Sequence, residues 1–255
     1  MPPQTDFLVE ARRVVEAARQ NNLTLRIMGA VAFRLHCPTH ESLHRALGRE
    51  ISDLDLMGLR DERRQVEKLM VNLGYTTHEQ ALAETQGMAP NRLFLYDRHN
   101  SRVVDVFFDQ LEMCHRIDFQ NRLQADYPTI SLAELLLEKM QIVRLSQKDI
   151  KDTVVLLLEH PIADNDRESV NGKHIAVLLS DDWGFYYTTM ENLRKVSISL
   201  ESFNVLGHDQ QHLVENRIQQ LMSIIEAQPK SSKWKMRARI GTKMKWYNDV
   251  EEIAR

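Results

Sequence analysis

Residues 51–59 read Ile-Ser-Asp-Leu-Asp-Leu-Met-Gly-Leu, and this stretch decides the fold of the first half of the chain. Its alternation predicts a β-strand with Asp53 and Asp55 on one face and Leu54 and Leu56 on the other. Two like charges side by side destabilise a strand unless a cation lies between them. Mg²⁺ prefers oxygen ligands and fits one or two carboxylates together with substrate phosphates. The stretch therefore predicts a metal site, with a water-exposed strand end as the alternative.

A glycine turn precedes this strand in the chain. Residues 23–28 (LTLRIM) predict another strand, Gly29 follows directly, and a helix is expected from Ala30 to Leu35. Backbone N–H groups at the start of such a helix can bind an anion. A plain tight turn is the alternative interpretation.

A third carboxylate lies further along the chain. Residues 92–96 and 102–108 predict two strands joined by a polar turn through His99 and Asn100. Asp105 lies in the second of them among valine and phenylalanine side chains. Burying an ionised acid there is costly, so Asp105 is expected to be paired, bound to a metal or protonated. A salt bridge to Arg102 or Arg49 is the alternative to a metal.

Helical periods dominate the rest of the chain. Segments 6–20 and 61–73 predict helices in the first half, the second capped by Asp61 and ended by Gly74. From Ser131 onward every strong signal is helical, over 132–145, 150–158, 174–195 and 208–227. The predicted fold class is therefore α/β (α+β) with a mixed sheet, followed by an all-α domain, with the boundary near Pro128.

Bulk composition excludes several classes of protein. The 255 residues have a formal net charge of −3, so attraction to nucleic acid would need a local patch. Because the chain has only two cysteines, Cys37 and Cys114, we do not expect a disulfide framework. No apolar run is long enough to span a bilayer. We expect a cytoplasmic protein with no membrane partner.

The order of these motifs resembles the polymerase β-type nucleotidyltransferase superfamily. The resemblance rests on Met28-Gly29-Ala30, on Arg49-x-x-x-Asp53-x-Asp55 and on the isolated Asp105. It implies a nucleotidyltransferase domain over residues 1–127 and a helical domain over 128–255. It also implies Mg²⁺ or Mn²⁺ on the three aspartates, and an NTP held near Gly29, Ala30, Arg49 and Ser52. Ala30 departs from the usual second glycine or serine.

The resemblance continues into the helical half. Residues 132–139 (LAELLLEK), then Arg144, then Lys148-Asp149-x-x-Asp152 are similar to abortive-infection type nucleotidyltransferase toxins. This implies that Lys139 and Asp152 complete the nucleotide site. From the residues alone, Lys139 lies in an apolar stripe and either reaches water or meets an anion. Lys148 and Asp152 could form a surface pair, and Ser146 with Asp149 predicts a helix cap.

A basic segment near the end of the chain is a possible nucleic-acid patch. Residues 230–245 contain seven lysines and arginines and no acid, with Trp234 inside and Trp246 directly after. Cations with aromatic rings suit phosphates and unpaired bases, and the patch would comprise Lys233, Trp234, Lys235, Arg237 and Arg239. A solvated helix face whose tryptophans dock on the domain is the alternative.

Two further clusters carry weaker signals. A zinc site of His36, Cys37, His40 and His44 is disfavoured by Pro38 and by the lack of a Cys-x-x-Cys pair. Cys114 and His115 are adjacent and point apart, so a core or surface role is expected. Asp181 and Asp182 are expected to start a helix over an aromatic layer.

Together the resemblance implies a Mg²⁺-dependent enzyme that moves a nucleoside monophosphate from an NTP to an acceptor hydroxyl. Two alternatives remain from the sequence. One is a degenerate relative that only holds nucleotide or RNA, which Ala30 favours. The other is a toxin–antitoxin component that modifies tRNA. The acceptor and the oligomeric state stay open.

Overall fold

The computed structural model describes residues 2–77 and 91–250. The chain divides into two compact units: Met1–Pro38, Glu50–Leu111 and Asp118–Ser131 form the first, and Thr39–Arg49, Glu112–Ile117 and Leu132–Arg255 form the second. The main change of unit falls after Ser131, close to Pro128. Two short segments of the first half, however, belong to the helical unit.

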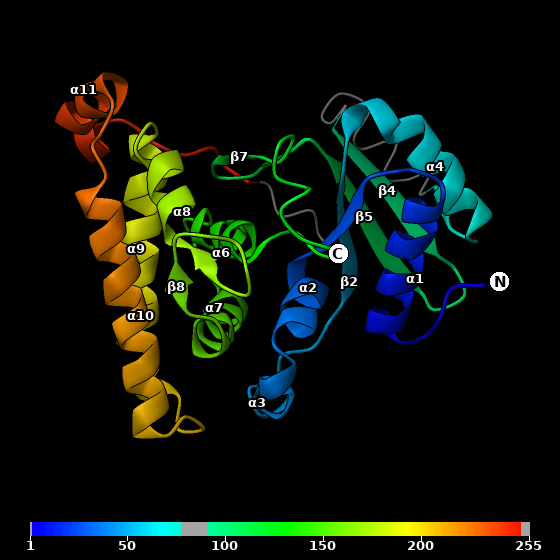
Figure 1. Ribbon diagram of the computed structural model, residues 1–255, viewed down its shortest axis with the longest axis horizontal. Coiled ribbons are helices and arrows are strands. Elements are labelled where there is room, and N and C mark those ends of the chain that lie inside the picture. Colours follow the sequence, from blue (N-terminus) through cyan, green and yellow to red (C-terminus); the bar gives the residue numbers. More distant parts are fainter. Residues whose placement is uncertain (1, 78–90, 251–255) are drawn as a thin grey trace. The chain divides into compact units, whose positions relative to one another are not determined.

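A five-stranded mixed sheet forms the first unit (Figure 1), with strand order β1-β2-β5-β4-β3. Its strands are β1 (Leu25–Met28), β2 (Asp53–Gly58), β3 (Thr76–Thr77), β4 (Arg92–Asp97) and β5 (Arg102–Phe108). Only β2 and β5 pair in parallel, and the other neighbours are antiparallel. The predicted mixed α/β architecture and the predicted hairpin of β4 and β5 are confirmed.

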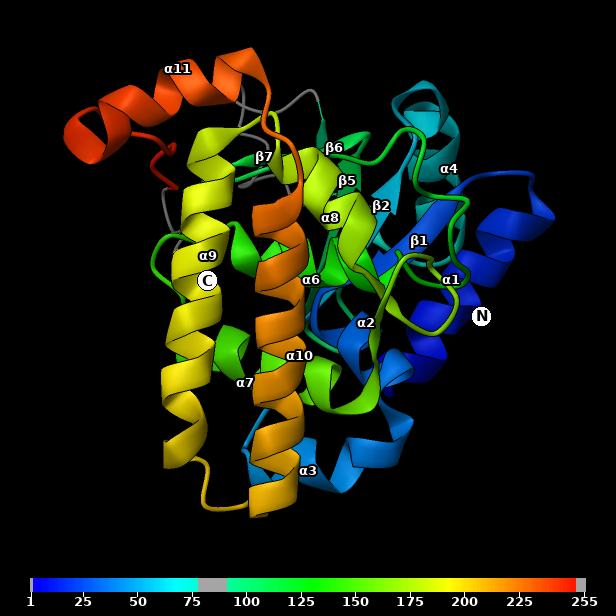
Figure 2. The same ribbon diagram turned by 60° about the vertical axis from the view of Figure 1, so that its left-hand side comes forward.

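Side chains alternate across this sheet as the sequence predicts. Leu54, Leu56, Val104 and Val106 are fully buried on one face. Figures 1 and 2 show α1 (Phe7–Gln20) and α4 (Arg63–Asn72) together on the same side of the sheet. Because successive side chains of a strand point to opposite faces, Asp53 and Asp55 of β2 lie on the other face.

Two helices of the first unit, α4 and α2 (Gly29–His36), begin at residues other than those predicted. Asp6 caps α1 by accepting hydrogen bonds from Leu8 and Val9 N–H. The predicted cap of α4 by Asp61 is wrong, because Asp61 lies inside a 3₁₀ turn, η2 (Arg60–Glu62), and Glu62 precedes the helix. The third helix, α2, begins at the glycine itself. Residues 78–90, for which the sequence predicts no element, lie outside the described residues.

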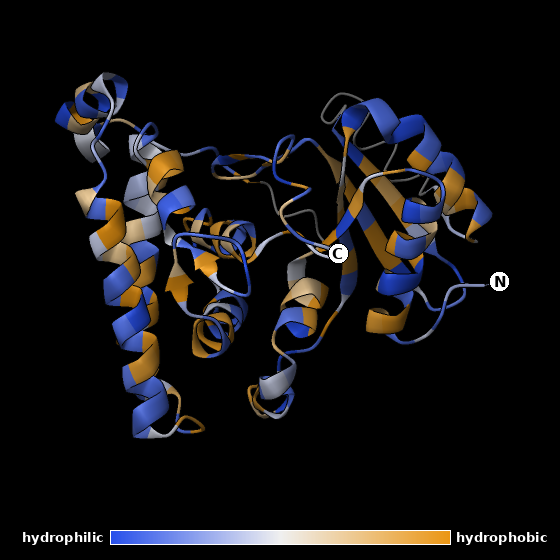
Figure 3. Cartoon of the chain, viewed as in Figure 1, coloured by the Kyte–Doolittle hydropathy of each residue, from blue (hydrophilic) through white to orange (hydrophobic). Residues whose placement is uncertain are grey.

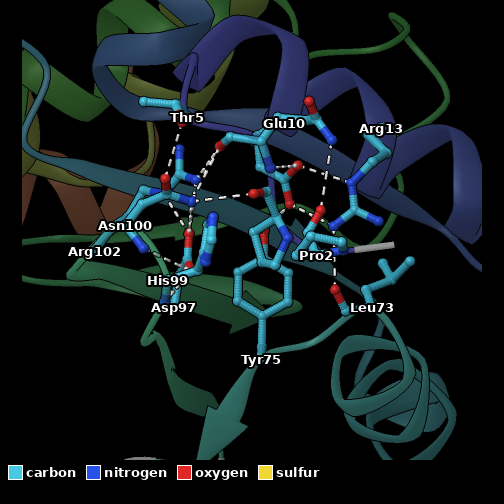
Figure 4. A network of polar contacts seen from close by, with 12 residues as sticks. Pro2, Thr5, Glu10, Arg13, Leu73, Tyr75, Asp97, His99, Asn100 and Arg102 are labelled. Carbon is cyan, nitrogen blue, oxygen red and sulfur yellow. Dashed lines mark hydrogen bonds and ion pairs between the residues drawn. The ribbon is translucent and has the colours of Figure 1, made fainter.

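A polar network joins the β4–β5 hairpin to α1 through Gln4 (Figure 4), because Arg102 donates to the Gln4 carbonyl and the Gln4 N–H donates to Glu10. Arg102 donates to Asp97 at 2.7 Å, and Asn100 also donates to Asp97. On the same side of the sheet, Tyr75 and Arg13 donate to the buried carboxylate of Glu10. The hairpin that carries Asp105 is therefore anchored by hydrogen bonds as well as by apolar packing.

The second unit is mainly helical, which confirms the prediction of a helical second half. Its elements are η1 (Pro38–His40), α3 (Glu41–Ala46), α6 (Leu132–Met140), α7 (Gln147–Glu159), α8 (Gly172–Leu179), α9 (Trp183–Ser199), η3 (Leu200–Ser202), α10 (His208–Ala227), α11 (Ser232–Ile240) and η4 (Gly241–Lys243). Short strands form two small sheets. One pairs β8 (Ile162–Ala163) with β9 (Val170–Asn171) in this unit, and the other pairs β6 (Gln110–Glu112) with β7 (Arg116–Asp118), whose residues are divided between the two units.

The single helix predicted over 174–195 is wrong. The chain forms α8 and α9 instead, separated at Ser180–Asp182, because Asp182 caps the second helix by accepting from Phe185 N–H. The helix predicted over 132–145 likewise ends at Met140. In contrast, α10 has the predicted bounds of 208–227.

The core of this unit follows helical periodicity. Val214, Ile218, Leu221 and Ile225 lie on one stripe of α10 and are fully buried. Figure 3 shows hydrophobic and hydrophilic segments in turn along α10, and Figure 2 shows α9 beside it. Within the described ranges, every helix is too short or too polar to cross a bilayer.

Candidate functional site

The three predicted aspartates share one face of two adjacent strands. In the parallel pairing of β2 with β5, Asp55 stands directly beside Asp105. Asp53 lies two residues earlier on the same face of β2. Asp53 and Asp105 are buried, with exposed fractions of 8% and 1%. Asp55 is half-buried, so Asp53 and Asp55 do not form the fully water-exposed strand end considered as the alternative.

The glycine turn reaches this acidic face. Strand β1 runs antiparallel to β2 with Met28 beside Asp55, so Gly29 follows at the level of that carboxylate. Gly29 has a φ of +63°, and a Cβ at this position would lie 2.3 Å from Asp55 Oδ2. Because no side chain fits in that space, the carboxylate approaches the backbone as only a glycine allows.

Two small residues complete this part of the site. Ser52 donates from its hydroxyl to Asp53 Oδ1 at 3.2 Å. Ala30 lies in the first turn of α2, which contains no acidic residue, and is 9% exposed. The amino end of a helix favours negative charge, so the turn adds positive potential beside the aspartates.

Arg92 is a functional candidate that sequence reasoning missed. Its Nη2 atom lies 2.8 Å from Asp105 Oδ2. The alternative partner Arg102 is wrong for this ion pair. Arg102 is three residues from Asp105 and so points to the opposite face of the strand, where it pairs with Asp97.

The hairpin register was the available signal for Arg92. With Asp97 opposite Arg102, Phe94 falls opposite Asp105 and Arg92 opposite Phe107. Arg92 is thus a diagonal neighbour of Asp105 on the same face, within reach of a long side chain.

Burial and charge act in opposite directions on Asp105. Burial raises the pKa of this carboxyl above its ordinary value, and the neighbouring Arg92 guanidinium opposes that rise. The net direction of the pKa is upward, so burial has the larger effect on this carboxyl.

The donor set fits a hard divalent cation held partly by substrate. Among the residues that the structure describes, no three Asp, Glu, His or Cys side chains are grouped so as to hold a metal ion by themselves. Asp53 and Asp55 nevertheless supply two carboxylates, and Mg²⁺ is commonly held by one or two carboxylates with phosphates and water as the other ligands. The carboxylate of Asp55 occupies the space that a Cβ on residue 29 would fill.

Three other predicted site residues contact one another within the helical unit. Arg49 donates twice to Asp152, with Nε–Oδ1 at 2.8 Å and Nη2–Oδ2 at 3.0 Å. Lys139 Nζ lies 3.2 Å from both Asp152 and Asp149. Asp152 is 1% exposed, so the surface pair suggested with Lys148 is wrong.

This cluster fixes the charge of Lys139. Burial alone would lower its pKa, but the carboxylates of Asp152 and Asp149 raise the pKa above the ordinary lysine value. The predicted capping box of Ser146 and Asp149 is confirmed at the start of α7. Lys139 therefore meets anions supplied by the protein, which keep it charged.

Helix α11 carries the basic segment. Trp234 packs edge-on against Tyr186 with ring centroids 5.1 Å apart, and Arg237 donates to the carbonyl of Gly241. The predicted docking of tryptophan on the domain is therefore present. Lys235 and Arg239 are exposed, and Lys233 lies 3.7 Å from Asp181.

Several residues of the two weaker clusters are buried or have protein partners. His36 Nε2 lies 2.6 Å from the Thr129 hydroxyl oxygen. His40 Nδ1 lies 2.7 Å from the Glu159 Oε2 atom. His115 and Cys114 are both buried, and His115 Nε2 lies 2.8 Å from the Thr188 hydroxyl.

Comparison with known proteins gives no match: no family model, no curated protein and no solved structure is significantly similar to this chain.

Proposed function

We propose that this chain is a Mg²⁺- or Mn²⁺-dependent nucleotidyltransferase of the polymerase β type, which moves a nucleoside monophosphate from an NTP to an acceptor hydroxyl. One observation carries the proposal: Asp55 stands beside Asp105 in the sheet and against Gly29 at the start of a helix. Carboxylates and an anion-binding turn thus occur together, as an NTP with its cation requires.

The chain's own residues have distinct roles in this proposal. Asp53 and Asp55 would hold the cation, which when bound neutralises phosphate charge. Gly29, Ala30 and Ser52 would lie along the triphosphate. The acceptor oxygen forms a bond to the α-phosphorus, the bond to the β-phosphate side breaks, and pyrophosphate leaves. Asp105 is the candidate to receive the hydroxyl proton or to ligate a cation.

The test is transfer from each labelled NTP in cell extract, with identification of what becomes labelled. Asp53→Asn and Asp55→Asn keep the shape of the side chain and remove its charge. We expect each to reduce transfer by at least about 100-fold, because positioning of phosphates dominates this chemistry. Asp61→Asn is the matched control, since Asp61 is exposed in the same unit and lies outside the site. No labelled product with any NTP would refute the proposal.

A second candidate function is RNA binding without catalysis of nucleotidyl transfer. The exposed cations of α11 favour it, and Ala30 departs from the family turn. Because Trp234 packs on Tyr186, RNA would be bound mainly through its phosphates. Binding with no release of pyrophosphate would support this candidate over the enzyme.

A further inference from the structure

The third aspartate of the acidic face already has a cation of the protein beside it. Arg92 Nη2 lies 2.8 Å from Asp105 Oδ2, and the carboxylate is 1% exposed. The Arg92 side chain keeps 22% of its surface exposed. One partner of the pair is thus enclosed while the other reaches the surface of its unit.

Two aromatic rings hold the guanidinium in place. The guanidinium carbon of Arg92 lies 4.1 Å from the ring centroid of Phe94 and 4.7 Å from that of Phe107. Both distances fall within the range of cation–π attraction. The guanidinium therefore has favourable contacts that do not depend on Asp105.

Sheet register places Asp105 between an acid and this cation. Asp55 is its neighbour on β2, and Phe94 is its neighbour on β4, with Arg92 two residues away on the same face. Ionised Asp55 and Asp105 repel each other across the strands. A positive charge near Asp105 relieves that repulsion, and a divalent cation at Asp53 and Asp55 would relieve it as well.

We propose that Arg92 is the internal counter-cation of Asp105 and that a divalent cation at the acidic face competes with it for this carboxylate. This inference rests on the proposed function, because it assumes that Asp53 and Asp55 bind such a cation. Arg92 is a positioning residue in this scheme. It holds the charge of Asp105 before the cation binds, and Phe94 and Phe107 retain the guanidinium afterwards.

Thermal unfolding with and without Mn²⁺, in the absence of nucleotide, tests the competition. Arg92→Met leaves Asp105 without this counter-cation, so we expect a lower Tm in chelator and a larger rise of Tm with Mn²⁺ than in the unchanged protein. Mn²⁺ affinity, measured by calorimetry, should become roughly tenfold tighter, as removal of one local positive charge predicts. Adding Asp105→Asn to Arg92→Met should abolish the excess response.

Arg102→Met is the matched control on the same hairpin. It also removes the arginine of a buried pair, since Arg102 lies 2.7 Å from Asp97. Asp97 faces the other side of the sheet and keeps hydrogen bonds from Asn100. We therefore expect a lower Tm without an excess response to Mn²⁺.

A response to Mn²⁺ in Arg92→Met that equals that of the unchanged protein, or that persists with Asp105→Asn, would overturn the inference. If Arg92→Met does not fold without cation, Arg92→Lys keeps the charge but lacks the two-pronged fork. It should show a response between those of the unchanged protein and Arg92→Met with Mn²⁺, and no difference from the unchanged protein would count against the inference. Failure of the transfer assay alone concerns the proposed function, because these measurements contain no nucleotide.

Discussion

The carboxylate of Asp55 lies so close to the α-carbon of Gly29 that a Cβ there would be 2.3 Å from Oδ2. The two residues come from β2 and from the turn after β1, and the pairing of Met28 with Asp55 brings them together. A local backbone requirement at residue 29 is thereby coupled to the position of a proposed cation ligand.

Gly29→Ala should therefore impair both stability and transfer. The left-handed backbone costs about 1–2 kcal/mol for a non-glycine residue, and the overlap with Asp55 must displace the carboxylate. We expect urea unfolding to show at least that loss, and the transfer rate to fall about 100-fold.

Gly48→Ala is the matched control for this substitution. Gly48 also has a positive φ of +62°, but a Cβ there would meet no atom within 4 Å. It should lose stability through backbone strain alone. Equal effects of the two substitutions on transfer would contradict the role assigned to Gly29.

The Arg49–Asp152 pair predicts a large stability effect within the helical unit. Arg49→Met leaves a carboxylate that is 1% exposed without its two-pronged partner, and breaking such a buried pair costs about 3–5 kcal/mol. Denaturant unfolding measures this loss. Lys148→Met should change stability by less than about 0.5 kcal/mol, because Lys148 is exposed. A comparable loss in both variants would contradict the pairing.

His115 predicts a loss of stability in mild acid. Burial lowers the pKa of His115 to about 4, against a smaller opposing effect of Asp182. The unfolded chain, with an ordinary pKa near 6.5, then binds the proton more readily than the folded chain. Stability is therefore complete above about pH 6.5 and falls as the pH drops toward 4, by about 2 kcal/mol at pH 5.

Unfolding of His115→Gln at pH 7.5 and pH 5 checks this prediction. Glutamine has no proton to gain and keeps a polar end near Thr188, so the pH dependence should flatten by that amount. His212→Gln, at an exposed position of α10, should leave the dependence unchanged. An unaltered slope in His115→Gln would disprove the assignment.

The basic segment predicts RNA binding that weakens with salt. Lys233, Lys235 and Arg239 are exposed, whereas Arg237 also supports the chain after α11 through Gly241 and Met244. Replacing the first three by glutamine should reduce the slope of log affinity against log salt by up to about 0.7 per lost phosphate contact. The same changes at Arg60, Arg64 and Lys68, which are exposed in the first unit, provide the control. An unchanged slope would argue against the patch.

Local periodicity explains which elements the sequence predicted well. Helices α1 and α10 and strand β2 have strong patterns and clear ends, and every bound was predicted within two residues. The apolar period continues on both sides of Ser180–Asp182, so periodicity alone predicted one helix there, whereas the helix start expected at Asp181 and Asp182 is confirmed. A capping aspartate decided the outcome there.

Ion pairs were predicted less well, because they depend on tertiary position. Arg49 and Asp152 are 103 residues apart, and no periodic pattern relates them. The Arg92–Asp105 pair was accessible in principle, since even and odd positions of a hairpin decide which face a side chain takes. Its prediction needed the register of the hairpin, which the predicted strands over 92–96 and 102–108 did not fix.

The hairpin carries two arginine–aspartate pairs, with Arg102–Asp97 on the core face and Arg92–Asp105 on the other. Slipping β5 by one residue against β4 would exchange the faces, bringing Asp105 among the leucines and Arg102 outward. Such a shift would break both pairs at once and disrupt the packing beneath α1. The register that buries the apolar face of the sheet is therefore the same register that forms the acidic face. A shifted register would destabilise the hairpin on both faces.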